Sequence, residues 1–382
     1  MDLELSSEQK LLKNTVRDFA EKEIAPVIEE LDRKEKFSYK LTAKMGELGL
    51  FGITVSPEYG GLGMDYLSYI LAVEELARID ASQAATIAAG NSLGIGPIYN
   101  FGSKAQKEKY LPKLCGGEKL WGFGLTEPNA GSDAGSTTTT AKLERKNWII
   151  NGSKIFITNA STKITWGSTV QAITGTTSEG KKEYSCIIVE NDTPGFEARP
   201  MKNKMVWRSS NTSELFFDNV RVPEENLLGK RGQGFHHMLN ALDSGRLSIA
   251  AMGVGGAQGA FELALKYANE RVQFGRPIIK FQTNAFKLAD MATEIEAARA
   301  LLYRACWLKD SKKSFSKEAA MAKLYASEVM GRVVNDAVQI FGGYGLMEEY
   351  PIARFYRDHK LLEIGEGTSE IQRLVISRHI GC

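Results

Sequence analysis

The sequence predicts an α+β protein in which a helical region, a β-rich region and a second helical region follow one another. Apolar residues recur at helical spacing in the first and last parts of the chain, whereas the middle has short β-type runs separated by tight turns. Because 382 residues are more than one hydrophobic core usually serves, we expect three domains. Their predicted bounds are 1–120, 121–231 and 232–382.

The first region has the signals of several helices. Ser6 and Gln9 have the spacing of a capping box, and Leu12, Val16 and Phe19 follow at helical intervals. Glycines at 60, 61 and 63 indicate a loop. Further helices are predicted at 39–48, 67–78 and 85–101.

The middle region predicts a small β-barrel or sandwich. Residues 148–158 have the pattern of two strands joined by a tight turn at Asn151-Gly152. Short β-type runs follow at 185–189 and 215–222, with turn-rich segments between them.

The third region contains an apolar stripe with a three-and-four spacing, which is typical of the interior of a helical bundle. The stripe consists of Leu288, Met291, Ile295, Ala298, Leu302 and Ala305.

Composition excludes several classes of function. Lys and Arg number 48 against 46 Asp and Glu, so the formal charge of +2 gives no overall drive toward nucleic acid or an anionic membrane. The four cysteines lack metal-type spacing, and with four histidines we expect no metal site. The acidic start at residues 1–5 does not resemble a signal peptide, and no apolar run approaches about 18 residues. We therefore expect a cytoplasmic protein.

Three glycine-rich segments are candidates for chemistry. Residues 124–136 crowd glycines and hydroxyl residues where a strand ends, which suits either a polar-ligand loop or an ordinary structural loop. Residues 339–345 place three glycines in a helical pattern, for which a plain turn between helices is the simpler interpretation. Glu366 lies between two glycines before a helix that Thr368 or Ser369 could cap. It is either a partly buried general base or a carboxylate stabilised by the helix dipole. Taken by itself, this segment favours the helix-dipole interpretation.

Together, these segments resemble the acyl-CoA dehydrogenase family, in matching order over the whole chain. Residues 124–136 are similar to the family's first signature, and 339–378 are similar to its C-terminal signature. Long ordered matches are far more specific than a short pattern. The resemblance implies an N-terminal helical domain, a central β-barrel and a C-terminal four-helix bundle. It also implies an oxidoreductase that converts an acyl-CoA thioester to the 2-enoyl-CoA.

The resemblance implies FAD, bound non-covalently between the β-barrel and the C-terminal bundle. Positions similar to those that line the flavin are Phe123, Leu125, Thr126, Gly131, Ser132, Phe156 and Thr158. A neighbouring subunit of a homotetramer would hold the pyrophosphate through Arg271, Gln273 and Phe274. The adenosine, pyrophosphate and ribose would be met by Gln339, Gly342, Gly343, Thr368 and Glu370.

Glu366 matches the family's catalytic base, which takes the α-proton while the β-hydrogen leaves as a hydride. Some members place the base just before the arginine equivalent to Arg246, where this chain has Gly245, so the two positions are complementary. Asp243 and Arg246 are also spaced as a salt bridge within a helix, and this pairing can coexist with a role in binding the thioester. The thioester-binding positions are Ser132, Asp243, Arg246 and Gly367.

One departure from the family pattern concerns the acyl group. The residue before the base is often tyrosine and here is Gly365, which predicts a wider cavity and a branched, cyclic or polar-ended short acyl group. Asn91 and Ser92, which correspond to the cavity floor, carry no charge, and this argues against a dicarboxyl substrate.

The resemblance further implies that an electron-transferring flavoprotein takes the electrons. An oxidase that passes them to oxygen is the alternative within the same chemistry. From other classes, a flavin-containing nucleic-acid-binding relative would need a strongly basic surface, and a catalytically silent scaffold would not need the loop and the base.

Overall fold

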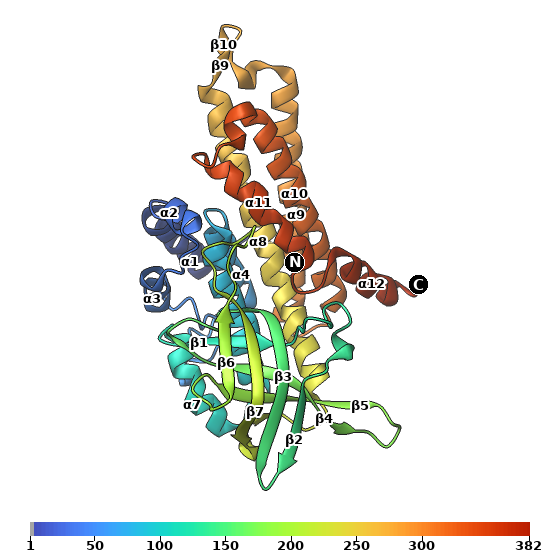
Figure 1. Ribbon diagram of the computed structural model, residues 1–382. Coiled ribbons are helices and arrows are strands. Elements are labelled where there is room, and N and C mark those ends of the chain that lie inside the picture. Colours follow the sequence, from blue (N-terminus) through green and yellow to red (C-terminus); the bar gives the residue numbers. More distant parts are fainter. Residues whose placement is uncertain (1–3) are drawn as a thin grey trace.

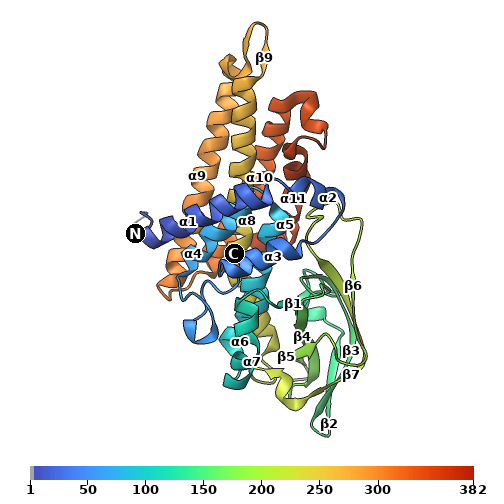
Figure 2. The ribbon, with the colours of Figure 1, turned by 90° about the vertical axis from the view of Figure 1, so that its left-hand side faces the viewer.

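A computed structural model describes residues 4–382, with helices in the first and last parts of the chain and a sheet between them (Figure 1). The first residues of the acidic start, 1–3, lie outside the described part. Of the N-terminal helices, α4, α5 and α6 pack against the long helix α8 (Figure 2). The seven N-terminal helices of the described part have the following bounds. They are α1 (Ser7–Phe19), α2 (Ile28–Arg33), α3 (Tyr39–Glu47), α4 (Tyr66–Ala77), α5 (Ala81–Ala89), α6 (Gly96–Phe101) and α7 (Lys104–Cys115).

Local sequence signals account for several helix ends in this region. The Ser6 hydroxyl accepts from Gln9 N at 3.1 Å, and the Gln9 side chain accepts from Ser6 N at 2.9 Å, which confirms the predicted capping box. The predicted helix at 85–101 is divided: a π-helical segment at Gly90–Ile95 joins α5 to α6. Short helical turns also occur at Ala20–Ile24 and Pro57–Tyr59.

The middle region forms one eight-stranded sheet with the order β6-β7-β3-β2-β4-β5-β8, and β1 pairs in parallel with β4. Most other neighbours are antiparallel, and inward-facing side chains such as Trp148, Ile150 and Val170 form their own buried cluster. The strands are β1 (Leu120–Gly124), β2 (Thr140–Glu144), β3 (Asn147–Thr158), β4 (Thr165–Thr176), β5 (Lys182–Glu190), β6 (Phe196–Pro200), β7 (Thr212–Pro223) and β8 (Leu227–Leu228).

The predicted hairpin at residues 148–158 is wrong. β3 continues through Asn151 and Gly152 as one strand, with a register shift against β7 between Ile150 and Gly152. Gly152 has φ +143°, and a Cβ there would lie 2.5 Å from Thr139 Oγ1, so the glycine serves a bulge with close approach rather than a turn. β3 lies between β2 and β7, and pairing on both sides keeps the strand continuous.

The C-terminal region is a bundle built around α8, α9 and α10. The six residues of the predicted stripe on α9 are all buried, as expected for a bundle interior. Within residues 4–382, no helix combines the length and apolar character needed to cross a membrane. The elements are α8 (Gly234–Glu270), β9 (Val272–Gln273), β10 (Arg276–Pro277), α9 (Gln282–Asp310), α10 (Ser316–Phe341), α11 (Pro351–Ile364) and α12 (Ser369–Ile380).

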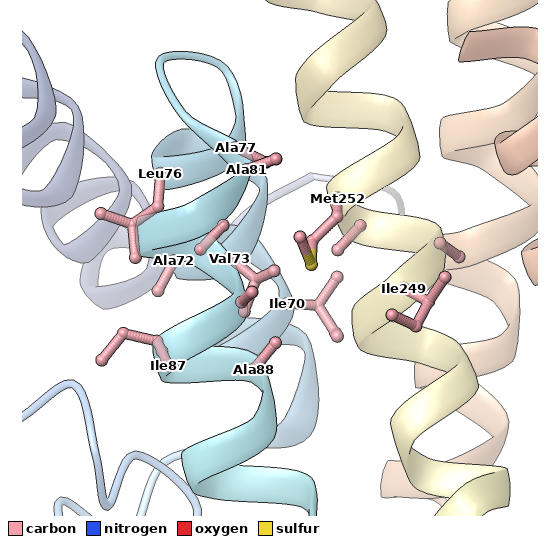
Figure 3. Packing of buried hydrophobic residues seen from close by; sticks show 14 of the residues in the cluster. Ile70, Ala72, Val73, Leu76, Ala77, Ala81, Ile87, Ala88, Ile249 and Met252 are labelled. Carbon is pink, nitrogen blue, oxygen red and sulfur yellow. The ribbon is translucent and has the colours of Figure 1, made fainter. Parts of the chain in front are cut away.

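Helices α4 and α8 pack at very short range. Ile70 and Val73 of α4 lie toward Met252 of α8 (Figure 3). Further along α8, Gly255 and Gly259 lie against the carbonyls of Glu74 and Arg78, where an added Cβ would come within 2.1 and 2.0 Å of the oxygens. Only glycine permits this approach, and it places the start of α4 beside the segment of α8 that contains Asp243 and Arg246.

Candidate active site

Glu366 occupies a turn between α11 and α12. Its φ is +54° and that of Gly367 is +95°, so two successive residues have left-handed backbone. Glycine adopts this conformation freely, but a glutamate there is strained. Thr368 caps α12 by accepting from Ile371 N at 3.3 Å, as predicted. The strained turn places the Glu366 side chain against α8.

The Glu366 carboxylate lies directly against Gly245 of α8. A Cβ at position 245 would be 1.8 Å from Glu366 Oε2, so no side chain fits there. Oε2 is buried and has no hydrogen-bond partner among residues 4–382. A buried carboxylate oxygen without a donor is unusual in folded proteins and marks a group available for chemistry.

Burial raises the pKa of Glu366 to about 7, against opposing effects of the positive charges of Lys323 and Arg246. Tyr66 and Tyr69 of α4 are also close enough for the Glu366 charge to contribute to their raised pKa values, after the larger effect of burial. A carboxyl group with a pKa near 7 is both ionised and basic at neutral pH.

The two α8 residues that sequence reasoning paired do form an ion pair. Arg246 Nη1 lies 2.5 Å from Asp243 Oδ1, and Ser316 Oγ donates to the same oxygen at 3.1 Å. Arg246 is buried, and its Nε has no hydrogen-bond partner within the described chain. Ser244 lies between them, and its carbonyl accepts from Tyr66 OH at 2.7 Å.

The predicted cavity floor is polar in composition, but several of its groups are already bonded. Asn91 Nδ2 donates to the carbonyls of Leu50 and Ile87 at 2.8 and 3.0 Å. Ser92 Oγ and Tyr69 OH both donate to Ala88 O, at 2.7 and 2.9 Å. Both hydroxyls therefore donate to the backbone of α5.

The loop that follows β1 is fixed by a buried ion pair. Lys154 Nζ of β3 donates to Glu127 Oε1 at 2.8 Å and to Leu125 O at 3.1 Å. Glu127 also accepts from Thr138 N at 2.7 Å and from Thr139 N at 3.0 Å. Burial would raise the pKa of Glu127, but the charge of Lys154 and these hydrogen bonds outweigh it and lower the pKa to about 2.

The seven predicted flavin positions near this ion pair lie on β1, in the loop after it and on β3. Ile155 N donates to Thr126 O at 2.9 Å, which joins the loop to β3 next to Phe156 and Thr158. The Phe156 side chain is 62% exposed, with φ +61°. Gly131 is exposed, and an added Cβ there would meet no atom within 4 Å. The remaining members of the group are Phe123 and Leu125, which are buried, and Ser132, which is exposed.

Other predicted flavin residues lie far from this loop within the chain. The hairpin β9–β10, with Arg271, Gln273 and Phe274, projects from the end of the bundle opposite to the sheet (Figures 1 and 2). Phe274 is 92% exposed, and the Arg271 guanidinium lies over the ring of Tyr344 at 5.5 Å. This contact brings the hairpin near the exposed residues Gln339, Gly342 and Gly343, whereas Thr368 and Glu370 lie beside Glu366.

Comparison with known proteins identifies this arrangement. Three family models match the chain: "Acyl-CoA dehydrogenase, N-terminal domain" at residues 6–118, "middle domain" at 122–220 and "C-terminal domain" at 232–381. A curated relative, a probable acyl-CoA dehydrogenase of Bacillus subtilis, is 51% identical over 380 residues, covering 100% of both chains. The chain belongs to the acyl-CoA dehydrogenase family.

Solved structures agree with this membership of the acyl-CoA dehydrogenase family. The butyryl-CoA dehydrogenase from Megasphaera elsdenii has a TM-score of 0.96, 46% identity and 100% coverage of both chains. A chain from a structure described as the electron transferring flavoprotein of Acidaminococcus fermentans has a TM-score of 0.96, 48% identity and 100% coverage of both chains. The predicted fold, with helical domains around a central β module, is confirmed.

Sequence reasoning missed three charged residues of the site. Glu127 and Lys154 lie in the segments 124–136 and 148–158, but their pairing across 27 residues leaves no local signal. Lys323 is different, because it interrupts the small apolar residues Ala319, Ala322 and Ala326 on the buried side of a helix. A lysine on such a stripe is a readable signal of a buried charge.

Proposed function

We propose that this protein removes the α-proton and the β-hydrogen of a short acyl-CoA thioester and releases the 2-enoyl-CoA, with Glu366 as the base. The observation that carries the proposal is the buried Oε2 of Glu366, which has no hydrogen-bond partner among residues 4–382 and lies against Gly245. Membership of the acyl-CoA dehydrogenase family supports the same reaction.

Glu366 takes the α-proton in this proposal. The Cα–H bond breaks, a Glu366 O–H bond forms, and negative charge develops on the thioester oxygen. The backbone N–H of Glu366 donates to that oxygen and stabilises the charge as it develops. Burial keeps the pKa of the base near 7, so proton transfer from carbon is more favourable than to an ordinary surface carboxylate.

The family depends on flavin, and we propose FAD as the cofactor. The exposed ring of Phe156 and the open space at Gly131 suit a planar group and a phosphate-bearing chain beside the loop. The residues of this group are Phe123, Leu125, Thr126, Gly131, Ser132, Phe156 and Thr158. The chemistry that FAD supplies when bound is acceptance of the β-hydrogen as a hydride.

A second copy of the chain would complete the flavin site. Arg271, Gln273 and Phe274 lie at the far end of the bundle from the loop, so they cannot meet the same cofactor within one chain. The 92% exposure of Phe274 suits burial against another copy. We infer a homotetramer in which this hairpin, with Gln339, Gly342 and Gly343, meets a neighbour's flavin, while Thr368 and Glu370 serve the pyrophosphate and ribose end.

The CoA portion would bind along the start of α8. Arg246 and Asp243 are already paired, and the free Nε of Arg246 has a donor to offer. Ser132 and Gly367 complete the proposed set. The electron acceptor would be an electron-transferring flavoprotein, in line with the description of the Acidaminococcus fermentans structure.

The acyl group is proposed to be short, with branched or cyclic groups accepted. Gly365 has φ −66° and ψ 151°, so its lack of a side chain is not required by the backbone, and the missing ring leaves room beside Glu366. The bonded hydroxyls of Ser92 and Tyr69 close the floor, and neither carries a charge that would hold a second carboxylate. Similarity to a butyryl-CoA dehydrogenase supports the short length.

The test is anaerobic reduction of the FAD-loaded protein by a panel of straight, branched, cyclic and dicarboxyl acyl-CoA thioesters. Short monocarboxyl thioesters should bleach the flavin, whereas glutaryl-CoA should not. Gly365→Tyr should lower kcat/KM for branched thioesters relative to butyryl-CoA by about tenfold, because a lost cavity of this size costs one to a few methylene contacts. Failure of every thioester to bleach the flavin would refute the reaction. Hydrogen peroxide formed in air at the rate of turnover would indicate an oxidase.

The domain bounds 1–120, 121–231 and 232–382 and the cytoplasmic location remain predictions from the sequence.

A further inference from the structure

Lys323 is a buried cation next to the turn that contains Glu366. Its side chain lies on the inner side of α10 and is 0% exposed. Its ammonium group donates to Gly367 O at 2.8 Å, so its hydrogen-bond partner is a backbone carbonyl and not a carboxylate. Burying an ammonium group costs free energy unless a nearby negative charge compensates for it.

The carbonyl that Lys323 binds belongs to the strained turn itself. Gly367 follows Glu366, and both have positive φ. Gln372 Nε2 donates to the same Gly367 oxygen at 2.8 Å and approaches Glu366 O at 3.4 Å. One charged donor and one neutral donor therefore hold the same peptide group, and with it the direction of the Glu366 side chain.

The helix that carries Lys323 is also joined to the end of α11. Ser327 Oγ contacts Lys323 O at 2.7 Å and Leu362 O at 2.9 Å. Leu362 lies four residues before Glu366. Side chains of α10 therefore hydrogen-bond to the backbone before the turn, at Leu362, and within it, at Gly367. Lys323 provides the only charged donor of these two contacts.

The charges around the base show what compensates for Lys323. The groups that act on Glu366 are Lys323 from α10 and Arg246 from α8, with Tyr66 and Tyr69 from α4 on another side. Arg246 already has Asp243 at 2.5 Å, so its charge is largely balanced. Burial lowers the pKa of Lys323 to about 8, opposed first by Glu366 and more weakly by Glu363 and Glu370, while Arg246 lowers it further.

We propose that Lys323 is a positioning residue for the base: it holds the Gly367 carbonyl so that Glu366 faces the α-carbon, and its charge keeps the Glu366 carboxylate ionised at neutral pH. This inference rests on the proposed role of Glu366. Lys323 exchanges no proton in the reaction, because the α-proton moves to Glu366 alone.

Removing the charge should move the titration of the base. In Lys323→Met, the ionised carboxylate loses the cation with the largest effect on it, so the acidic limb of the flavin-reduction rate should shift upward by about one pH unit. The plateau rate should also fall about tenfold, because the carboxylate is less well directed. Lys323→Arg keeps a cation, so the acidic limb of its flavin-reduction rate should lie close to that of the unchanged protein.

Gln372→Met is the matched control. It removes a neutral donor from the same Gly367 carbonyl and leaves every charge in place. Its plateau rate should fall, but its acidic limb should coincide with that of the unchanged protein. The rates are measured by anaerobic stopped-flow reduction of the FAD-loaded enzyme with butyryl-CoA between pH 5.5 and 9.

A second measurement does not depend on turnover. The loss of Tm caused by Lys323→Met is compared in the Glu366 and Glu366→Gln backgrounds. At about pH 7.5 the loss should be larger with Glu366 by about 2 °C, because an ionised carboxylate then loses its cation. At about pH 5, where Glu366 is protonated, the two losses should agree. Lys323→Gln, which keeps a donor without a charge, replaces Lys323→Met if the latter does not fold.

Two results would overturn the proposal. One is an acidic limb that stays in place in Lys323→Met and Lys323→Gln while Tm falls, which would assign Lys323 a packing role only. The other is a Tm cycle with equal losses at both pH values. If the unchanged protein were not reduced by any thioester, the proposed reaction would fail, but the Tm cycle would still decide whether Lys323 and Glu366 interact.

Discussion

Glu127 and Glu366 of this protein have pKa values on opposite sides of the usual value. Glu127 accepts from Lys154 and two backbone N–H groups, and its pKa is lowered to about 2. Glu366 has a buried Oε2 with no hydrogen-bond partner within residues 4–382, and its pKa is raised to about 7. Burial acts in the same direction on both, so the charge of Lys154 and the hydrogen bonds that Glu127 receives decide the difference. The first carboxylate is structural, and the second is available to react.

The largest effect is expected at the reactive member of the pair. Glu366→Gln keeps the size of the side chain but cannot accept the α-proton. Flavin reduction by butyryl-CoA should slow by about two to four orders of magnitude, the range that a general base contributes. Thioester binding, measured by titration of the flavin spectrum, should change little. Reduction within tenfold of the original rate would remove Glu366 from the mechanism.

Loss of the ion pair between Glu127 and Lys154 should lower the stability of the protein. Lys154→Met leaves Glu127 buried without its cation, which should cost about 3–5 kcal/mol in the free energy of unfolding and weaken FAD binding. Urea denaturation and the flavin content after gel filtration measure both effects. Lys154→Met combined with Glu127→Gln should recover much of the loss, because no buried charge is then unpaired. A single variant as stable as the original would show that the ion pair does not fix the loop.

A smaller effect tests the space in front of the base. Gly245→Ala places a methyl group where Glu366 Oε2 now lies, at 1.8 Å. The carboxylate must move by about 1 Å or more, and kcat should fall about a hundredfold. Gly116→Ala, at the exposed C-terminal end of α7, is the control, because a Cβ there would come no closer than 3.5 Å to the atoms around it. An unchanged kcat in Gly245→Ala would mean that the carboxylate faces elsewhere during turnover.

The mildest test is pH. Because the pKa of Glu366 is raised to about 7 and the base acts in its ionised form, kcat/KM should rise with pH and level off above about 7. Below that value it should fall tenfold per unit. Glu127, with its pKa lowered to about 2, contributes nothing to this profile. An acidic limb near pH 4.5 would mean that Glu366 is solvated in the working enzyme.

The sequence predicts the order of helical and β regions because the apolar periodicity is strong, as on α9. It fails at Asn151-Gly152, where a turn signal is overridden by pairing on both sides of β3. The position of Glu366 in a turn was readable from its flanking glycines. The surroundings of its carboxylate could not be predicted, because Gly245, which lies against Oε2, belongs to a helix more than a hundred residues earlier in the chain.

The two glycines of α8 that lie against the backbone of α4 limit how the substrate range of this enzyme can change. Since Gly255 and Gly259 leave no gap at the carbonyls of Glu74 and Arg78, the two helices behave as a single rigid body. Mutations therefore cannot change the shape of the substrate site by sliding α4 along α8 without breaking that contact. Adaptation to longer or bulkier thioesters must therefore proceed by exchange of individual side chains, as at Gly365, whose backbone conformation other residues can also adopt.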